Sequence, residues 1–318
     1  MKISVIGCGR WGSFIAWYLN EIGHEVMLYG RENSRHMQQF KQTRENGIIH
    51  LKENVQLVTN LTQAVKADTI VISINSQNLR GLMGELNNLN PQDKTFVLCM
   101  KGLEVESGKR LSEIVHESLE VPHEVAVWLG PGHVQEFYAG IPNCMVIDGE
   151  NDKIKEKLVE EFSSDLIRFY YGQDLIGNEI GAAAKNIIGI AAGMLDGLGL
   201  SSLKGALMSR GTREIARLIK LMGGNELSAY GLCHLGDYEA TVFSEFSHNR
   251  MFGEKFVKGE EYTQLAEGAF AVKGILLLAE KTYCSLPICT GVYDVIYGGQ
   301  EAKTIINKLF SRSIKNEF

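Results

Sequence analysis

Apolar residues in the first half of the chain occur in short runs separated by longer amphipathic segments. We expect strands at residues 2–6, 25–29, 55–58, 69–74, 95–100, 125–129 and 144–147, because each run is rich in β-branched and other apolar residues. A helix is predicted over 12–22, where apolar residues recur at helical spacing: Phe14, Ile15, Tyr18, Leu19 and Ile22. Continuous apolar strands that alternate with helices indicate a parallel sheet covered on both faces.

The pattern changes after about residue 175, where apolar positions follow a helical period and strand-like runs largely vanish. Pro287 is the one proline of five that lies beyond residue 150, and long stretches without proline suit helices. We therefore expect an α/β fold with two domains. Residues 1–175 form a Rossmann-like, doubly wound sheet that binds a dinucleotide, and residues 176–318 form an all-α substrate domain.

The first predicted strand leads directly into Gly7-Cys8-Gly9-Arg10-Trp11-Gly12, a G-x-G-x-x-G motif that opens the predicted helix. After a strand and before a helix, this motif is typical of dinucleotide binding. The first glycine allows the tight turn, the second lets the backbone approach the pyrophosphate, and the third permits close packing of helix on strand. The alternative interpretation is a glycine-rich structural turn.

The end of the second predicted strand indicates which dinucleotide binds. An acidic residue there would bond the ribose 2′-hydroxyl and repel a 2′-phosphate. The strand instead ends Tyr29-Gly30-Arg31, and Glu32 follows. Arg31 can pair with a 2′-phosphate or lie over adenine, or it is a solvated surface residue. We therefore favour NADP(H) as the cofactor, with NAD(H) tolerated.

Composition narrows the class of function. The 318 residues are 45% hydrophobic and 22% charged with a formal net charge of -6, which suits a globular enzyme acting on small molecules and argues against broad nucleic-acid binding. No run of about 18 apolar residues and no signal-peptide pattern is found, so we expect no membrane span and a cytoplasmic location. The six scattered cysteines favour reduced thiols over disulfides or a metal site.

Lys185 is the first candidate for the chemistry, because it stands among small and apolar residues in the helix predicted to begin near residue 178. One interpretation is that its long side chain carries the ammonium group out to solvent. The other is that it lies partly desolvated in a cleft, where its pKa falls and it becomes a useful proton donor and acceptor.

Other polar groups stand where substrate could bind. The segment 231–250 combines an acid, an amide and cations, which suits an oxyanion or phosphate site but would also suit a polar loop. Lys101 directly follows the fifth predicted strand, and Gly130-Pro131-Gly132-His133 follows the sixth. Ligands of open α/β sheets bind at the carboxyl ends of strands, so both positions are candidates for contact with substrate or cofactor.

The order of these motifs resembles that of the NAD(P)-dependent glycerol-3-phosphate dehydrogenase family, in its bacterial soluble form, over nearly the whole chain. The matching segments are G-x-G-x-W-G at 7–12, K-G at 101–102, G-P at 130–131, G-x-x-x-K-N at 181–186, G-L-G at 197–199, S-R-G at 209–211, L-G-D at 235–237, N-R at 249–250 and E-G at 267–268. The ordered set is much more specific than any one of its members.

The resemblance implies roles for the matching residues. The implied catalytic residues are Lys185, which transfers the proton, with Lys101 and Asp237. The implied substrate-binding residues are Lys101, Gly130, Gly132, Thr241, Ser247, His248, Asn249 and Arg250. The implied cofactor-binding residues are Gly7, Gly9, Arg10, Trp11, Gly12, Arg31, Lys101, Val134, His248 and Glu267, and no metal is implied.

The resemblance also implies a reaction, the transfer of a hydride between NAD(P)H and dihydroxyacetone phosphate. The product, sn-glycerol 3-phosphate, would feed glycerophospholipid synthesis. The implied partner is thus a small phosphorylated three-carbon substrate. Members of the family are often homodimers, although the sequence does not reveal an interface.

Two positions depart from the family pattern, both on the substrate side. His248 stands where the family usually has an arginine that grips the substrate phosphate, and histidine cannot form a bidentate fork. Gly132 stands where a serine or threonine hydroxyl usually faces the substrate. Three hypotheses follow: glycerol 3-phosphate is retained with His248 and Arg250 sharing the phosphate, another small ketone or hydroxy compound is the substrate, or the chain is a weakly active NAD(P)-binding regulatory protein. Retention of the three catalytic residues favours an enzyme.

Overall fold

The computed structural model describes residues 1–314, 316 and 317. The chain forms two compact units. The first consists of Met1–Lys101 and Lys109–Leu175, and the second of Gly102–Gly108 and the chain from Ile176 onward. Each unit has its own hydrophobic core.

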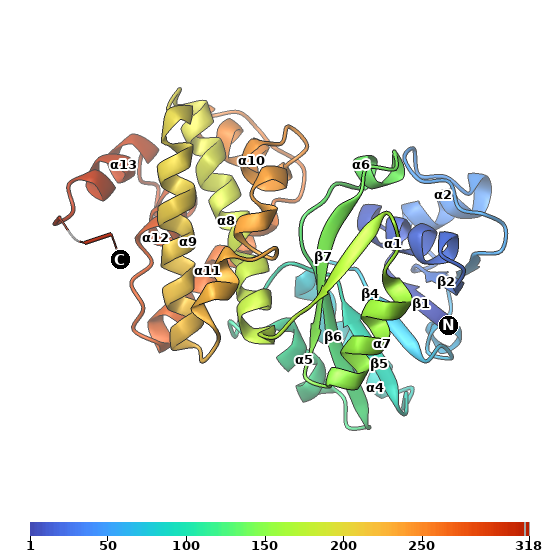
Figure 1. The fold of residues 1–318 in the computed structure, drawn as a ribbon. Coiled ribbons are helices and arrows are strands. Elements are labelled where there is room, and N and C mark those ends of the chain that lie inside the picture. Colours follow the sequence, from blue (N-terminus) through green and yellow to red (C-terminus); the bar gives the residue numbers. More distant parts are fainter. Residues whose placement is uncertain (315, 318) are drawn as a thin grey trace. The chain divides into compact units, whose positions relative to one another are not determined.

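The first unit is built on an eight-stranded sheet in the order β3-β2-β1-β4-β5-β6-β7-β8 (Figure 1). Its strands are β1 (Lys2–Ile6), β2 (Glu25–Tyr29), β3 (Gln56–Val58), β4 (Thr69–Ile72), β5 (Lys94–Leu98), β6 (His123–Leu129), β7 (Asn143–Gly149) and β8 (Ile167–Tyr171). From the central β1 the chain runs outward to β3 and then returns to continue on the other side with β4. Ligands of such sheets bind at the carboxyl ends of the strands, where the order reverses.

Two features of the sheet differ from the expectation. β7 pairs with β6 in the antiparallel sense, whereas all seven predicted strands were expected to be parallel. β8 was not predicted, because Ile167 and Phe169 are buried while Arg168 and Tyr170 are exposed, so the strand lacks a continuous apolar run. Such alternation is normal for an edge strand with one face in water.

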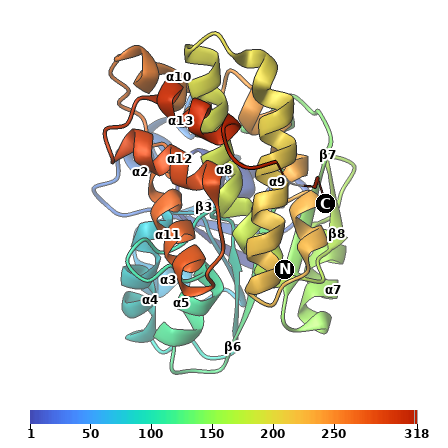
Figure 2. The ribbon, with the colours of Figure 1, turned by 90° about the vertical axis from the view of Figure 1, so that its left-hand side faces the viewer.

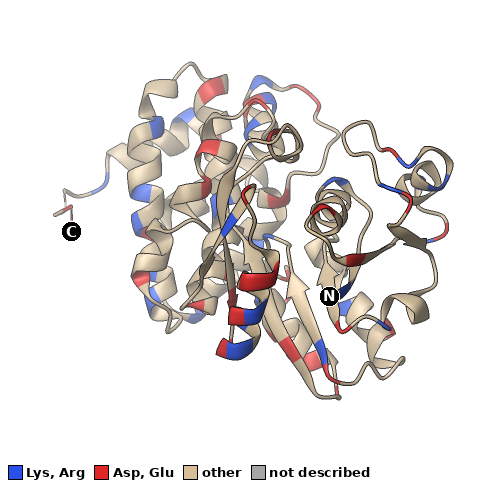
Figure 3. Ribbon diagram, turned by 45° about the vertical axis from the view of Figure 1, so that its right-hand side comes forward, with Lys and Arg blue, Asp and Glu red and all other residues tan. Residues whose placement is uncertain are grey.

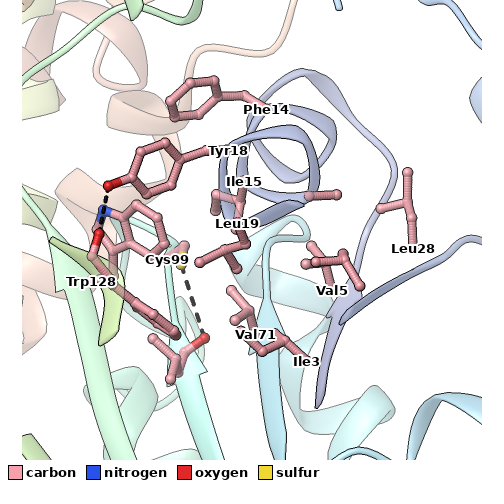
Figure 4. Close-up of a cluster of buried hydrophobic side chains, with 14 of the residues drawn as sticks. Ile3, Val5, Phe14, Ile15, Tyr18, Leu19, Leu28, Val71, Cys99 and Trp128 are labelled. Atoms are coloured by element: carbon pink, nitrogen blue, oxygen red, sulfur yellow. Dashed lines mark hydrogen bonds between the residues drawn. The ribbon is translucent and has the colours of Figure 1, made fainter. Parts of the chain in front are cut away.

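Helices connect the strands of the first unit: α1 (Arg10–Glu21), α2 (Arg35–Thr43), α3 (Leu61–Ala64), α4 (Leu79–Asn87), α5 (Leu111–Ser118), α6 (Val134–Tyr138) and α7 (Asp152–Phe162). Figure 4 shows the buried face of α1, with Ile15 and Leu19 directed toward Val5 and Val71 of the sheet. The Tyr18 hydroxyl reaches the Phe162 carbonyl and lies 2.8 Å from Ser164 Oγ. These contacts fix the helix that carries the glycine-rich loop.

The second unit is helical, with α8 (Leu175–Gly197), α9 (Lys204–Leu221), α10 (His248–Lys258), α11 (Glu267–Lys281), α12 (Pro287–Ile296) and α13 (Ala302–Phe310). Single-turn elements lie between α9 and α10, namely η3 (Glu226–Tyr230), η4 (Leu235–Asp237) and η5 (Glu239–Phe243). α11, α12 and α13 pack in succession (Figure 2). Among the described residues, no helix combines the length and apolarity needed to cross a membrane.

α8 is the centre of the second unit, and its residues are buried from Gly177 to Leu195. Its glycines allow neighbouring backbone to lie directly against it. A Cβ added to Gly189 would lie 2.6 Å from Thr241 Cγ2, and one added to Gly193 would lie 1.9 Å from the Arg250 carbonyl oxygen. The small residues of α8 therefore bring η5 and α10 close to the helix that carries Lys185.

The segment Gly102–Gly108 belongs to the helical unit, although the sequence assigned it to the first domain. Leu103 is completely buried in the helical core. The Lys281 ammonium donates to the Ser107 carbonyl at 2.9 Å. The segment follows its apolar side chain into the helical core, a contact distant in sequence that a local pattern does not reveal.

Candidate active site

The loop between β1 and α1 has the shape of a pyrophosphate cradle. Gly7 adopts φ +115°, and a Cβ there would lie 2.0 Å from the Ser73 carbonyl oxygen. A Cβ on Gly12 would lie 1.9 Å from the Gly7 carbonyl oxygen. No described side chain caps α1 at Gly9, so the amides of the first turn face outward as donors for an anion. The residues present fit a dinucleotide.

The other predicted cofactor residues of this region differ in their surroundings. Trp11 packs against Phe14 and Phe137, with ring centroids 5.1 and 6.2 Å away, so it is also part of the core. Burial lowers the pKa of the half-buried Arg10. Arg31 is exposed, and its guanidinium lies 3.9 Å from Glu85, an ion pair too loose and solvated to neutralise it.

Lys101 bridges the carboxyl ends of two neighbouring strands. It follows β5, and its ammonium donates to the carbonyl of Gly130, which follows β6, at 2.6 Å. The sequence placed both residues at this edge of the sheet, and the structure brings them into contact. The bond fixes a positive charge where ligands of α/β sheets bind.

Position 132 leaves no room for a side chain. Gly132 adopts φ +140°, and a Cβ there would lie 2.2 Å from Phe137 Cε2. Phe137 lies on α6, which begins at the buried Val134. A serine or threonine hydroxyl at position 132 is therefore incompatible with this conformation.

Lys185 is buried, which decides against the interpretation that it extends to solvent. Its side chain lies on α8 with 8% of the residue exposed, and its ammonium is 3.1 Å from Asp237 Oδ2. The ammonium also donates to Thr241 Oγ1 at 2.8 Å, and the Thr241 hydroxyl in turn donates to the Asp237 carbonyl at 2.7 Å. The structure thus joins three predicted residues in one hydrogen-bonded group. The group can hold and deliver a proton at Lys185 Nζ.

Asn249 lies beside this group and links three helices. Its amide nitrogen donates to Asn186 Oδ1 at 3.1 Å, and its amide oxygen accepts from the Gly268 backbone at 2.9 Å. Asn186 follows Lys185 on α8, and Gly268 lies in the first turn of α11, next to Glu267. The predicted substrate residue Asn249 is therefore held in one orientation by the protein.

Arg250 lies in a different ionic cluster. Its guanidinium is 2.9 Å from Asp196 Oδ2 and 3.0 Å from Glu254 Oε2, and it donates to the Ser244 carbonyl at 3.0 Å. Lys204, which the sequence analysis did not single out, is 2.7 Å from the same Asp196 oxygen. These carboxylates satisfy the charge that the sequence assigned to a shared substrate phosphate.

Ser247 and His248 lie at the start of α10. Ser247 caps the helix by accepting from the Arg250 backbone at 3.3 Å, a structural use of its hydroxyl. His248 Nδ1 is 2.6 Å from the Tyr262 hydroxyl. Both residues therefore already have partners within the helical unit.

Sequence reasoning missed one group beside Lys185. His234 is completely buried, with its ring between the Gly181 carbonyl and the Tyr238 hydroxyl. A lone histidine within the segment 231–250 gives no local signal, because its partner Gly181 lies 53 residues away in the sequence. Both ring contacts are with residues of the helical unit.

Charge over the surface agrees with a small-molecule enzyme. Figure 3 shows basic and acidic residues interspersed along the elements of the face in view. The formal net charge is -6. On this face basic residues therefore alternate with acidic ones instead of gathering in one stripe.

The glycine-rich loop on a mostly parallel sheet, with a buried lysine–aspartate pair in a helical unit, defines a nicotinamide-dependent oxidoreductase. Two family profiles cover the chain. The one described as NAD-dependent glycerol-3-phosphate dehydrogenase N-terminus matches residues 2–155, and its C-terminus counterpart matches residues 174–307. The chain belongs to the NAD-dependent glycerol-3-phosphate dehydrogenase family.

Individual relatives agree with this assignment. A glycerol-3-phosphate dehydrogenase (NAD(P)+) from Thermotoga sp. (strain RQ2) is 36% identical, with 100% of this chain and 99% of the relative covered. One from Exiguobacterium sp. (strain ATCC BAA-1283 / AT1b) is 34% identical over 99% and 97%. The crystal structure of glycerol-3-phosphate dehydrogenase from Coxiella burnetii superposes with a TM-score of 0.91 at 26% identity, covering 98% of this chain and 99% of that one. The predicted family, fold class and NAD(P)-dependent enzyme class are confirmed.

Proposed function

We propose that this chain transfers a hydride between NAD(P)H and dihydroxyacetone phosphate, forming glycerol 3-phosphate. The observation that carries the proposal is the buried Lys185 in contact with Asp237 and Thr241, in a chain of this family. A dehydrogenase that reduces a ketone needs a proton donor as well as a hydride. Lys185 is a cation held in fixed orientation by a carboxylate and a hydroxyl, which suits that role.

The bound cofactor supplies the hydride, and the protein supplies orientation and protons. Lys185 Nζ donates its proton to the carbonyl oxygen of the ketone, and in the reverse direction it removes the proton from the hydroxyl. Asp237 holds the ammonium in place, and Thr241 fixes its direction. The family resemblance gives Lys101 a supporting role, as a positive charge that stabilises the developing oxyanion.

A second substrate class is favoured by one observation. Arg250 is bonded to two carboxylates that offset its charge, and the neighbouring predicted phosphate ligands, His248 and Asn249, carry no guanidinium. An imidazole and an amide bind a phosphate dianion less strongly than an arginine fork does. The alternative substrate is therefore a small ketone or hydroxy compound with less negative charge.

The cofactor preference proposed is NADP(H) over NAD(H). Arg31 follows the tip of β2, is exposed, and makes only a loose ion pair with Glu85, so its charge is accessible to a 2′-phosphate. Arg31→Ala is expected to raise the KM for NADPH about tenfold and leave the KM for NADH nearly unchanged. Equal effects on both cofactors would contradict the preference.

We also propose a homodimer in the cytoplasm. Large apolar side chains are exposed on the helical unit, among them Leu221, Leu227 and Phe310, which would favour self-association. All six cysteines are described and are free thiols, which suits a reducing compartment. Light scattering of the purified protein should give twice the mass of 35.3 kDa, and a mass equal to one chain would contradict the dimer.

The deciding experiment for the function is a substrate panel assayed with NADH and NADPH in parallel. Dihydroxyacetone phosphate is expected to give the highest kcat/KM, and unphosphorylated dihydroxyacetone a much lower one. The opposite order would establish the less charged substrate class. Absence of turnover with every ketone at high concentration would contradict the enzyme.

A further inference from the structure

A buried histidine closes a hydrogen-bonded chain beside Lys185. His234 Nδ1 lies 2.8 Å from the Gly181 carbonyl oxygen, and because a carbonyl only accepts, Nδ1 carries the proton. Nε2 is then the acceptor, and the Tyr238 hydroxyl donates to it at 2.8 Å. The Thr212 hydroxyl donates to Tyr238 at 3.3 Å. Each donor in this chain therefore has an acceptor.

This series of hydrogen bonds connects three structural elements around Lys185, the proposed proton donor. Thr212 lies on α9, Gly181 lies on α8 one helical turn before Lys185, and His234 precedes the turn η4 that carries Asp237. The turn rests directly on the backbone of α8, since a Cβ on Gly181 would lie 3.1 Å from His234 Cβ. The imidazole thus ties the support of Asp237 to the support of Lys185.

Burial keeps the imidazole uncharged. Desolvation lowers the pKa of His234 to about 4, against the opposing effects of the Gly181 hydrogen bond and the Asp237 charge. The groups that face it are the hydroxyl of Tyr238, the carboxylate of Asp237 and the ammonium of Lys185. A protonated ring would compete with Lys185 for Asp237, whereas a neutral ring only bonds and orients.

We propose that His234 is a positioning residue, which clamps the Asp237 turn onto α8 and so fixes the distance and direction of the Lys185–Asp237 pair. The inference rests on the proposed role of Lys185. It assigns a function to a residue that touches neither substrate nor cofactor. The clamp acts through geometry, and a small misplacement of a reacting group can lower a rate by about 100-fold.

The test compares three variants in the full chain. His234→Leu removes both hydrogen bonds and is expected to lower kcat at least tenfold with dihydroxyacetone phosphate, while the KM for NAD(P)H stays within about twofold. His234→Gln can donate to Gly181 and accept from Tyr238, so it should recover most of kcat. Tyr238→Phe keeps the imidazole and its bond to Gly181, so it should give a smaller loss and a shifted pH profile of kcat.

The control is Tyr18→Phe, which removes a buried tyrosine hydroxyl that is hydrogen-bonded within the first unit. It should lower thermal stability and leave the pH profile unchanged. If His234→Leu fails to fold, Tyr238→Phe carries the test. Equal kcat values for the leucine and glutamine variants, or an unchanged pH profile in Tyr238→Phe, would overturn the proposal.

A second readout separates this inference from the proposed function. The pKa of the Lys185 ammonium, followed by NMR of carbon-13-labelled lysine, should change in His234→Leu and Tyr238→Phe and return toward the original value in His234→Gln. Lack of turnover in the unaltered protein would contradict the proposed function, whatever the NMR result. An unaltered Lys185 resonance in all variants would contradict the clamp, even in an active enzyme.

Discussion

Lys185 and Asp237 form a buried ion pair, with 3.1 Å between Nζ and Oδ2, in which the aspartate is 1% exposed. Burying two charges is costly, and their attraction rarely adds net stability compared with apolar residues of similar size. A pair retained at such a position is therefore better explained by chemistry than by stability. Single substitutions can distinguish the role of Lys185 from that of Asp237.

Lys185→Met should lower kcat with dihydroxyacetone phosphate by about 100- to 10,000-fold, because it removes the proton donor. The Kd for NAD(P)H, measured by the fluorescence of the bound cofactor, should change by less than about threefold. The reason is that the glycine-rich loop at residues 7–12, which is predicted to bind the cofactor, does not include Lys185. Lys273→Met is the matched control, because this lysine of α11 lies over the ring of Tyr297 and has no role in the proposed chemistry. Survival of the rate in Lys185→Met would show that the assigned role is wrong.

Asp237→Asn should destabilise the protein by about 3–5 kcal/mol, because it leaves the Lys185 charge buried without its carboxylate. The double variant Lys185→Met/Asp237→Asn should regain part of this free energy of unfolding but no activity. Urea unfolding of the four proteins gives the coupling energy. Additive effects of the two substitutions would contradict a coupled pair.

The sheet and its loop could be predicted because their signals are local. Continuous apolar runs marked the parallel strands, and the glycines at 7, 9 and 12 marked the turn. The antiparallel sense of β7 could not be predicted, because strand direction depends on where the chain returns and not on the residues of the strand. β8 was missed because only alternate residues are buried.

Less of the candidate active site could be predicted, because its contacts join residues that are far apart in the sequence. Lys185 was conspicuous among apolar neighbours, but its contacts with Asp237 and Thr241 join residues far apart in the chain, and only the family resemblance linked them. The substrate role of Arg250 came from the family resemblance and stays a prediction, and the sequence does not reveal that Asp196 lies beside its guanidinium. The sequence alone does not indicate which acidic residue lies beside which basic residue in the folded protein.

Glu214 should make stability depend on pH. It is 1% exposed and accepts from the Ile288 and Cys289 amides at 2.9 Å each, capping α12. Burial raises its pKa above the ordinary 4.5, although the two amide bonds oppose the shift. Between pH 4.5 and the raised pKa, the folded protein therefore binds more protons at Glu214 than the unfolded chain does. The contribution of Glu214 to the free energy of unfolding is lost as pH rises through the raised pKa.

Glu214→Gln removes this titration while keeping an oxygen that accepts from the amides. The free energy of unfolding of the unaltered protein, minus that of the variant, should be largest below pH 4.5 and should fall as pH rises through the raised pKa of Glu214. Glu280→Gln, at an exposed position of α11, serves as the control with a constant difference. Parallel curves for the unaltered protein and Glu214→Gln would contradict the assignment.

Gly132→Ala should be strongly destabilising, because the added Cβ would meet the Phe137 ring at 2.2 Å and the backbone has φ +140°. Gly140→Ala is the matched control, since it also has positive φ, +84°, but no atom within 4 Å of the added Cβ. The control should lose about 1–2 kcal/mol from backbone strain alone. Chemical unfolding of both variants isolates the steric part, and equal losses would show that Phe137 moves aside.

His248→Arg tests whether the departure at this position weakens phosphate binding. His248 begins α10 and bonds the Tyr262 hydroxyl at 2.6 Å. An arginine would add a permanent charge and a bidentate fork, so the KM for dihydroxyacetone phosphate should fall about fivefold while that for unphosphorylated dihydroxyacetone stays constant. Tyr262→Phe separates the loss of the tyrosine bond from the gain of charge, and should not lower either KM. Added salt should weaken the gain in His248→Arg, because the new contact is ionic. A KM that rises with the arginine would establish that the site is built for a less charged substrate.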